Sequence, residues 1–142
     1  MLANCGGWWK PVATGERTCV DTDILIGVAR RTTRALAFWQ RAEAHSTMTC
    51  SVISICELLA GCRNPREQRE LLRDLARVEV VHVESGDSFD AFHWYQTYHL
   101  SQGFGFLDCF IAAAATRLGC ALHTLNVKHF RVVPGLPVKR PY

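Results

Sequence analysis

The segment that most constrains the fold is a short strand that ends on an acid and passes at once into an apolar helix. Thr18-Cys19-Val20 favours an extended strand, Asp21 follows it, and Ile24-Leu25-Ile26 begins a helical pattern. This layout is typical of a buried parallel strand whose carboxyl end lies where open α/β sheets bind their ligands. A carboxylate there costs desolvation free energy unless a cationic group meets it. Further acids at the same edge would therefore require a metal ion.

Strand-like and helix-like segments alternate through the rest of the chain. Further strands are expected at 47–53, 78–83, 121–124 and 131–133, with helical segments at 24–42, 54–59, 66–76, 85–101, 106–118 and 126–130. Strands separated by helices indicate an α/β fold with a parallel sheet. We predict a three-layer α/β/α sandwich around a central, mainly parallel sheet of four to five strands.

Length and composition favour one globular domain. The 142 residues are 49% hydrophobic and 20% charged, which excludes a disordered chain. The longest apolar run, 109–115, is too short to cross a membrane. Residues 1–17 show no periodicity and are expected to form a poorly ordered extension, with a single domain at 18–142. The absence of a secretory pattern and of paired cysteines favours a cytoplasmic, reduced protein.

Three carboxylates stand where a strand gives way to a helix or where a helix begins. They are Asp21, Glu57 and Asp108, and Asn126 supplies an amide oxygen after the fourth strand. Two carboxylates about 4 Å apart repel by roughly 4 kcal/mol at an effective dielectric near 20, so several stay ionised together only around a cation. An all-oxygen site favours Mg²⁺ or Mn²⁺, and such ions activate water for attack on phosphorus. Phosphodiester hydrolysis is the reaction class that this pattern favours.

Each of these residues also has a structural alternative. Asp21 and Asn126 suit the N-cap position of the helices that follow them. Glu57 closes Ser54-Ile55-Cys56-Glu57, which has the form of a capping box. Asp108 in a first helical turn would interact favourably with the helix dipole, and Asp23 could be a structural helper of Asp21.

Three segments of the chain read VDTDILIG, SVISICELLAG and FGFLDCFIAAAATRLGCALHTLNVKHF. In these segments the chain resembles the PIN-domain ribonucleases, and within them the VapC toxins of bacterial toxin–antitoxin pairs. Each segment alone is a weak pattern, but the three follow one another in order at separations like those of the family. The resemblance implies a PIN-like fold.

The resemblance also implies the site and the partners. Asp21, Glu57 and Asp108 would be the metal ligands of a Mg²⁺-dependent endoribonuclease, with Mn²⁺ as a possible substitute. Asn126 occupies the family's fourth site position, and Thr124 matches a hydroxyl that lines the pocket. The partners implied are an RNA substrate, a VapB-like antitoxin protein and a second copy of the chain, with no membrane. His129 matches a histidine of such chains and is expected to have a surface or packing role.

Several alternatives stay open at this point. Asp21-Thr22-Asp23-Ile24-Leu25 and Gly86–Asp90 also resemble the motifs of haloacid-dehalogenase-like phosphatases, in which Asp21 would be the nucleophile. A housekeeping PIN nuclease without an antitoxin and a catalytically decayed PIN binding module are further possibilities. The aromatic residues Phe38, Trp39, Phe89 and Phe92 could serve an interface, although core packing is the simpler assignment for each.

Overall fold

A computed structural model describes residues 15–142 of the chain. In order, the elements are β1 (Arg17–Val20), α1 (Thr22–Ala29), α2 (Thr33–Glu43), β2 (Thr47–Ser51), α3 (Val52–Ala60), α4 (Pro65–Asp74), β3 (Glu79–Val81), α5 (Ser85–Gln102), α6 (Phe106–Leu118), β4 (Leu122–His123), α7 (Val127–Phe130) and β5 (Val138–Lys139). Residues 1–14 of the expected N-terminal extension lie outside the described residues. Strand β1 begins at Arg17, one residue before the expected start of the domain.

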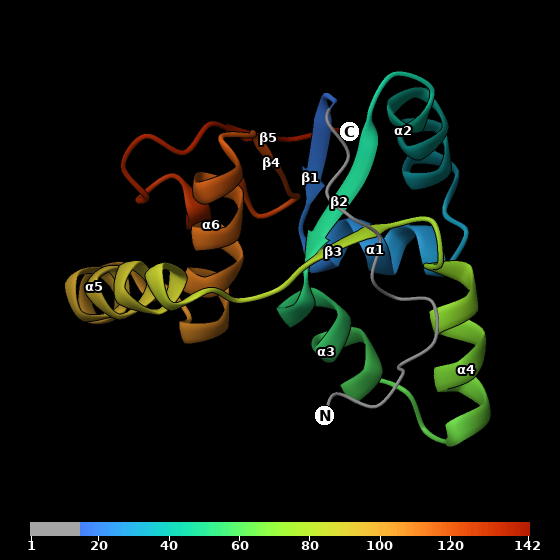
Figure 1. The fold of residues 1–142 in the computed structure, drawn as a ribbon, viewed down its shortest axis with the longest axis horizontal. Helices are drawn as coiled ribbons and strands as arrows, with labels where there is room; N and C mark the ends of the chain where they lie inside the picture. The colour runs from blue at the N-terminus through green and yellow to red at the C-terminus, as the bar shows by residue number, and fades with distance from the viewer. Residues whose placement is uncertain (1–14) are drawn as a thin grey trace.

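The central sheet has five strands in the order β3-β2-β1-β4-β5, and every pairing between neighbouring strands is parallel. The chain builds the sheet outward from β1 through β2 to β3, then returns to the other side of β1 with β4 (Figure 1). The direction of winding therefore reverses between β1 and β4. In open parallel sheets, the crevice outside the carboxyl ends of the strands at such a reversal is the usual ligand site.

Helices cover both faces of the sheet, as the sequence predicts. Alternate side chains of β1 point to opposite faces, so that Cys19 packs with α5 and α6 whereas Val20 packs with α1, α2 and α3. Figure 1 shows α5 and α6 on one side of β1 and β2, with α1 and α2 on the other. The predicted three-layer α/β/α sandwich is confirmed. Within residues 15–142, no helix is both long enough and apolar enough to cross a membrane.

The first crossover differs from the single helical segment expected at 24–42. Helix α1 ends at Ala29 and α2 begins at Thr33, with Arg31 between them in the left-handed region at φ 56°. The two helices pack closely because Gly27 has no side chain. A Cβ atom at Gly27 would lie 2.9 Å from the Cβ of Ala35. Apolar periodicity continues through this corner, which is why the pattern alone conceals it.

The prediction of a strand at 131–133 is also wrong. The Arg131 and Val133 N–H groups donate to Val127 O and Phe130 O, which extends α7 into a turn. Gly135 then adopts φ 73°, a conformation that favours glycine, and the chain reverses before Val138–Lys139 pairs with β4. The final strand of the sheet is therefore β5, several residues later than expected.

The aromatic residues divide between the core and the surface. Phe38 is buried and Trp39 is partly buried against the same core, so core packing is confirmed for Phe38. Phe89 and Phe92 on α5 are 76% and 64% exposed, and core packing is wrong for both.

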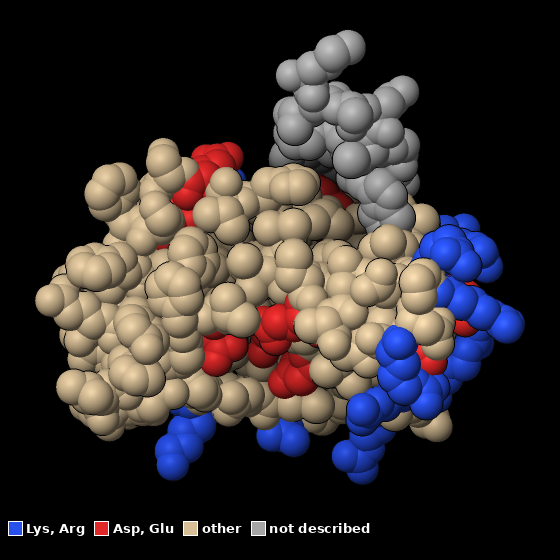
Figure 2. All heavy atoms as spheres, turned by 90° about the horizontal axis from the view of Figure 1, so that it is seen from below, with Lys and Arg blue, Asp and Glu red and all other residues tan. Residues whose placement is uncertain are grey.

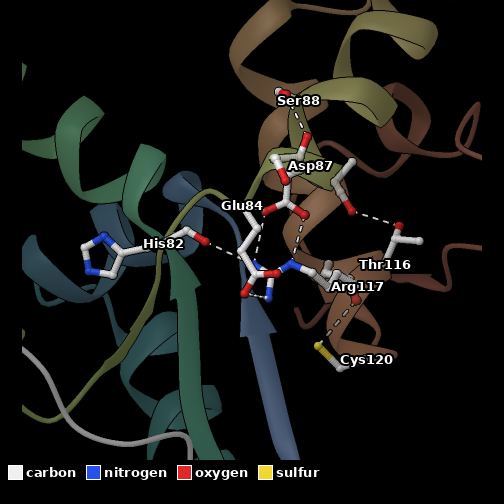
Figure 3. Close-up of polar contacts among 10 residues, drawn as sticks. His82, Glu84, Asp87, Ser88, Thr116, Arg117 and Cys120 are labelled. Atoms are coloured by element: carbon white, nitrogen blue, oxygen red, sulfur yellow. Dashed lines mark hydrogen bonds and ion pairs between the residues drawn. The ribbon is translucent and has the colours of Figure 1, made fainter.

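Arg117 of α6 holds the start of α5 in place (Figure 3). Its guanidinium donates to Asp87 Oδ1 at 2.9 Å, to Glu84 Oε1 at 3.1 Å and to the carbonyl oxygen of His82 at 3.0 Å. The Asp87 side chain is only 2% exposed and also accepts the Glu84 N–H at the helix N-terminus. One cation thus fixes the β3–α5 junction to the helix that carries Asp108.

We expect Arg117→Ala to lower the free energy of unfolding by about 3 kcal/mol, because it leaves the Asp87 carboxylate buried without its cation. The measurement is urea denaturation of both proteins. Arg63→Ala is the matched control. Arg63 also pairs with an acid, Glu67, but its side chain is 85% exposed, so the variant should leave the free energy of unfolding unchanged. Equal losses in the two variants would contradict this role of Arg117.

Candidate functional site

Asp21 lies at the reversal point of the sheet and is 6% exposed. Its backbone N–H donates to His123 O at 2.9 Å, which ties it to the end of β4. Its Oδ1 accepts the Thr22 N–H at 2.7 Å, and its Oδ2 accepts the Thr124 hydroxyl at 2.8 Å. The structural alternative for Asp21 is therefore correct: it caps α1. The capping role leaves the carboxylate at the carboxyl end of the sheet.

Thr124 joins the two acids of the first motif. It is fully buried, and its Oγ1 lies 2.8 Å from Asp21 Oδ2 and 3.2 Å from Asp23 Oδ2. A hydroxyl has one proton to donate, so it can serve only one carboxylate at a time. Asp23 Oδ2 also accepts the Leu125 N–H at 2.9 Å, whereas Asp23 Oδ1 is buried without a hydrogen-bond partner among the described residues.

Glu57 lies in the second turn of α3, and the capping-box alternative is wrong for it. The helix begins at Val52 rather than Ser54, and its N-cap is Ser51, whose hydroxyl accepts the Ile53 N–H at 3.2 Å. This releases the Glu57 side chain from any capping role. Its Oε1 is buried and has no hydrogen-bond partner in the described part of the chain.

Asp108 lies in the first turn of α6, one turn beyond the break at 103–105. Its Oδ2 lies 3.4 Å from His129 Nε2, and the Asn126 side-chain amide lies 3.0 Å from His129 Nδ1. Asn126 stands at the N-cap position of α7, but its side chain makes no capping hydrogen bond within the described residues. The sequence predicts only a surface or packing role for His129; in the structure His129 also contacts Asp108. The three-residue spacing of Asn126 and His129 indicates the contact between these two side chains, whereas the contact of His129 with Asp108 joins α7 to α6.

The pKa shifts show that these carboxylates share one electrostatic environment. Burial, and then the charges of Asp23 and Asp108, raise the pKa of Asp21 to about 7, although the Thr124 and Thr22 hydrogen bonds oppose the shift. Burial and the nearby Asp108 charge raise the pKa of Glu57. Burial likewise raises the pKa of Asp108, opposed by His129 and reinforced by Asp23.

The structure therefore brings the sequence-predicted acids into one region. Asp21 and Asp23 come from the β1–α1 junction, Glu57 from α3 and Asp108 from α6. Figure 2 looks onto the end of the sheet where β2 leads into α3, and Asp and Glu atoms gather near the middle of this face while Lys and Arg atoms concentrate at one end. Asn126 is exposed, and its amide is directed to His129.

These donors fit a hard divalent cation by their chemistry. Buried carboxylates that raise one another's pKa are stabilised by a cation, and an all-oxygen donor set suits Mg²⁺ or Mn²⁺. Asp23 Oδ1 and Glu57 Oε1 are buried oxygens that a cation would satisfy. Among the described side chains, however, no three of His, Cys, Asp or Glu are grouped closely enough to hold an ion as they stand. The fit rests on the donors and their electrostatics rather than on a preformed cage.

Two cavities reach this region along α1. One, of about 580 Å³, is lined by residues of α1, α3 and α4, including Glu57 and Arg30. The other, of about 500 Å³, is lined by Asp23 and Arg30 together with Leu125 and residues of α2. Both cavities are lined by Ile26 and Arg30, so they adjoin along α1; the first reaches Glu57 and the second reaches Asp23.

Comparison with known proteins tests the resemblance to the PIN-domain ribonucleases. Residues 18–136 match the family model of the PIN domain. Over 114 residues the chain is 35% identical to Ribonuclease VapC10 of Mycobacterium tuberculosis, a match that spans 78% of this chain and 84% of that protein.

Solved structures share the fold. VapBC2 from Rickettsia felis, bound to a promoter DNA fragment, superposes with a TM-score of 0.72 at 21% identity, covering 87% of this chain and 97% of that chain. A toxin–antitoxin complex from Klebsiella pneumoniae gives a TM-score of 0.68 at 23% identity, covering 88% and 98%. The parallel sheet, the family match and the extent of the VapC10 similarity agree. The chain belongs to the PIN-domain family and, within it, to the group that contains the VapC ribonucleases.

Proposed function

We propose that this protein is a divalent-metal-dependent endoribonuclease that acts as the toxin of a toxin–antitoxin pair. The observation that carries this proposal is the group of acids at the reversal point of a PIN-domain sheet, whose pKa values are raised by burial and by neighbouring carboxylates. The similarity to a protein named as a VapC ribonuclease supports RNA as the substrate. The phosphatase alternative is weaker. Asp87, in the segment that resembles the second phosphatase motif, is paired with Arg117 and so is not available for catalysis.

Asp21, Glu57 and Asp108 are the residues that would hold Mg²⁺ or Mn²⁺. The ion would neutralise phosphate oxygens and activate water for attack on an RNA phosphodiester. The protein contributes orientation and burial: Thr124 fixes Asp21 on one side, and His129 lies against Asp108 on the other. Asp23 adds negative charge to the region and is held by the Leu125 N–H. Asn126 acts through His129, which it contacts.

Asp108→Asn is the variant that tests nuclease activity. It keeps the size of the side chain but removes one charged ligand, so we expect at least about a 100-fold loss of RNA cleavage, because even residues behind metal ligands cost 10- to 100-fold when mutated. The measurement is the cleavage rate of total cellular RNA in Mg²⁺, with mapping of the new 5′ ends. Asp90→Asn, an exposed acid of α5, is the matched control and should cleave normally.

Two outcomes would overturn the nuclease proposal. Cleavage by Asp108→Asn at the wild-type rate would exclude Asp108 from the site. Absence of cleavage by the wild type in both Mg²⁺ and Mn²⁺ would instead favour a decayed binding module.

The two cavities beside α1 support an antitoxin partner. Their linings include the apolar Ile26 and Leu58 and the acids Glu57 and Asp23, with Arg30 in both cavities. A peptide that presents apolar side chains and one Arg or Lys would match this surface and neutralise the acids. Such a partner would block the access of RNA to the site, which is the action expected of an antitoxin.

The outer face of α5 supports a homodimer. Phe89, Phe92 and Leu100 are 76%, 64% and 95% exposed, and with Gln96 they recur at helical spacing. The stripe carries no formal charge, so it can meet an identical stripe without repulsion. A two-fold dimer requires such a self-complementary patch.

Phe92→Arg should convert the dimer into a monomer, because it would bring like charges together in the two-fold contact. Sedimentation velocity of the wild type and the variant measures this. Ala44→Arg, which adds the same charge to the exposed end of α2, is the control and should stay dimeric. A wild type that sediments as a monomer at high concentration would contradict the dimer.

A further inference from the structure

The cavity of about 500 Å³ that reaches Asp23 lies at the corner where α1 passes into α2. Its volume is within the range of about 300 to 1,000 Å³ that is usual for ligand sites. Among the described side chains that line it, Asp23 is the sole acid, whereas Arg30 and Arg34 are both cations. Positive charge therefore exceeds negative charge in this cavity, although it adjoins a group of carboxylates.

The neighbouring cavity of about 580 Å³ has the opposite balance of charge. Its described lining includes four acids and two cations, and one of these cations, Arg63, is paired with Glu67. An anionic ligand would therefore be attracted to the smaller cavity rather than to the larger one.

The two cations of the smaller cavity are not engaged by other described residues. Arg30 is the C-cap residue of α1, Arg34 lies in the first turn of α2, and both are exposed. Within residues 15–142, neither guanidinium forms a hydrogen bond or an ion pair. By contrast, Arg66 and Arg117 are paired with acids. Guanidinium groups left free in one cavity are suited to a phosphate, whose oxygens accept their N–H groups in pairs.

The cavity adjoins the acids of the candidate site through Asp23 and Leu125. Both residues line it, and the Leu125 N–H donates to Asp23 Oδ2 at 2.9 Å. Leu125 directly follows Thr124, whose hydroxyl donates to Asp21 Oδ2 at 2.8 Å. On the face drawn in Figure 2, Lys and Arg atoms likewise lie toward one end of the central acids. A phosphate bound in the cavity would thus lie next to the site that is proposed to cleave RNA.

We propose that this cavity is a subsite for one nucleotide of the RNA, next to the phosphodiester that is cleaved. Arg30 and Arg34 bind its phosphate, and the aromatic ring of Tyr142, which also lines the cavity, offers a surface on which the base can stack. Only a nucleotide that is not base-paired can enter, because the bases of a duplex are stacked inside it. The inference rests on the proposed function, for which it names residues that hold the substrate beside the acids.

The test is the binding of a short, fluorescently labelled single-stranded RNA to the full-length protein, followed by fluorescence anisotropy over a series of salt concentrations. EDTA is present, so that metal-dependent cleavage does not alter the RNA. We expect Arg30→Ala and Arg34→Ala each to weaken binding about tenfold, because each removes charge-assisted hydrogen bonds. Each should also lower the slope of log affinity against log salt by about 0.7, the contribution of one phosphate contact with a single strand. Arg30→Lys keeps the charge and should keep the slope.

Arg41→Ala is the matched control. Arg41 is also an exposed cation of α2 without an ion pair among the described residues, but it lines neither cavity. This variant should bind the RNA with the affinity and the salt slope of the wild type. Should an alanine variant misfold by circular dichroism, Arg30→Gln and Arg34→Gln take its place.

Three results would overturn the subsite. They are equal salt slopes for the wild type, Arg30→Ala and Arg34→Ala, an equal loss of affinity in Arg41→Ala, and equal affinity of the wild type for a duplex of the same sequence. None of them bears on the nuclease proposal, which cleavage by the wild type and Asp108→Asn decides. Binding that depends on Arg30 and Arg34 in a protein that cleaves no RNA would support the subsite and overturn the nuclease instead.

Discussion

Four carboxylates share one partly buried region at the carboxyl end of the sheet, and the repulsion among them is the constraint on which the site depends. Burial and neighbouring charge both disfavour the ionised forms, as the pKa of about 7 for Asp21 shows. Protonation relieves the repulsion at low pH, and a bound cation relieves it at neutral pH. In the function proposed above, a divalent ion would stabilise such a group of acids, and the proposed chemistry would use that same ion.

The sheet topology produces this arrangement from residues far apart in the sequence. Because β1 lies between β2 and β4, the chain leaves its carboxyl end through α1, enters α3 next to it, and returns through α6 and β4. Asp21 and Thr124 meet across adjacent strand ends, 103 residues apart in sequence. Arg117 holds α6 at its other end by fixing α6 to the β3–α5 junction. The sheet and helices thus fix where the acids lie, and the charges of the acids determine the electrostatic environment of the site.

Sequence patterns predicted what depends on local chemistry and on strand order. The alternation of strands and helices gave the α/β sandwich, and the acid after the first strand indicated the site edge. The sequence pattern does not predict the corner at Arg31, because apolar periodicity continues through it. It does not predict the turn at 131–133 either, because Gly135, the residue at which the chain reverses, lies beyond that segment. The contact of His129 with Asp108 joins two helices, so local spacing indicates it only weakly. The assignment of Asp21, Glu57 and Asp108 as ligands remains a prediction.

The free energy of unfolding as a function of pH, with and without Mg²⁺, tests the central claim most directly. The pKa of Asp21 is raised from 3.8 to about 7 in the folded protein, so the folded state binds more protons between these values and metal-free stability should fall as pH rises through them. At about 1.4 kcal/mol per pKa unit the loss reaches up to about 4 kcal/mol. Mg²⁺ should restore stability above pH 7, and Asp21→Asn should show a smaller pH slope and little response to Mg²⁺. Equal slopes in both proteins and no effect of Mg²⁺ at pH 8 would contradict a cation site built on these acids.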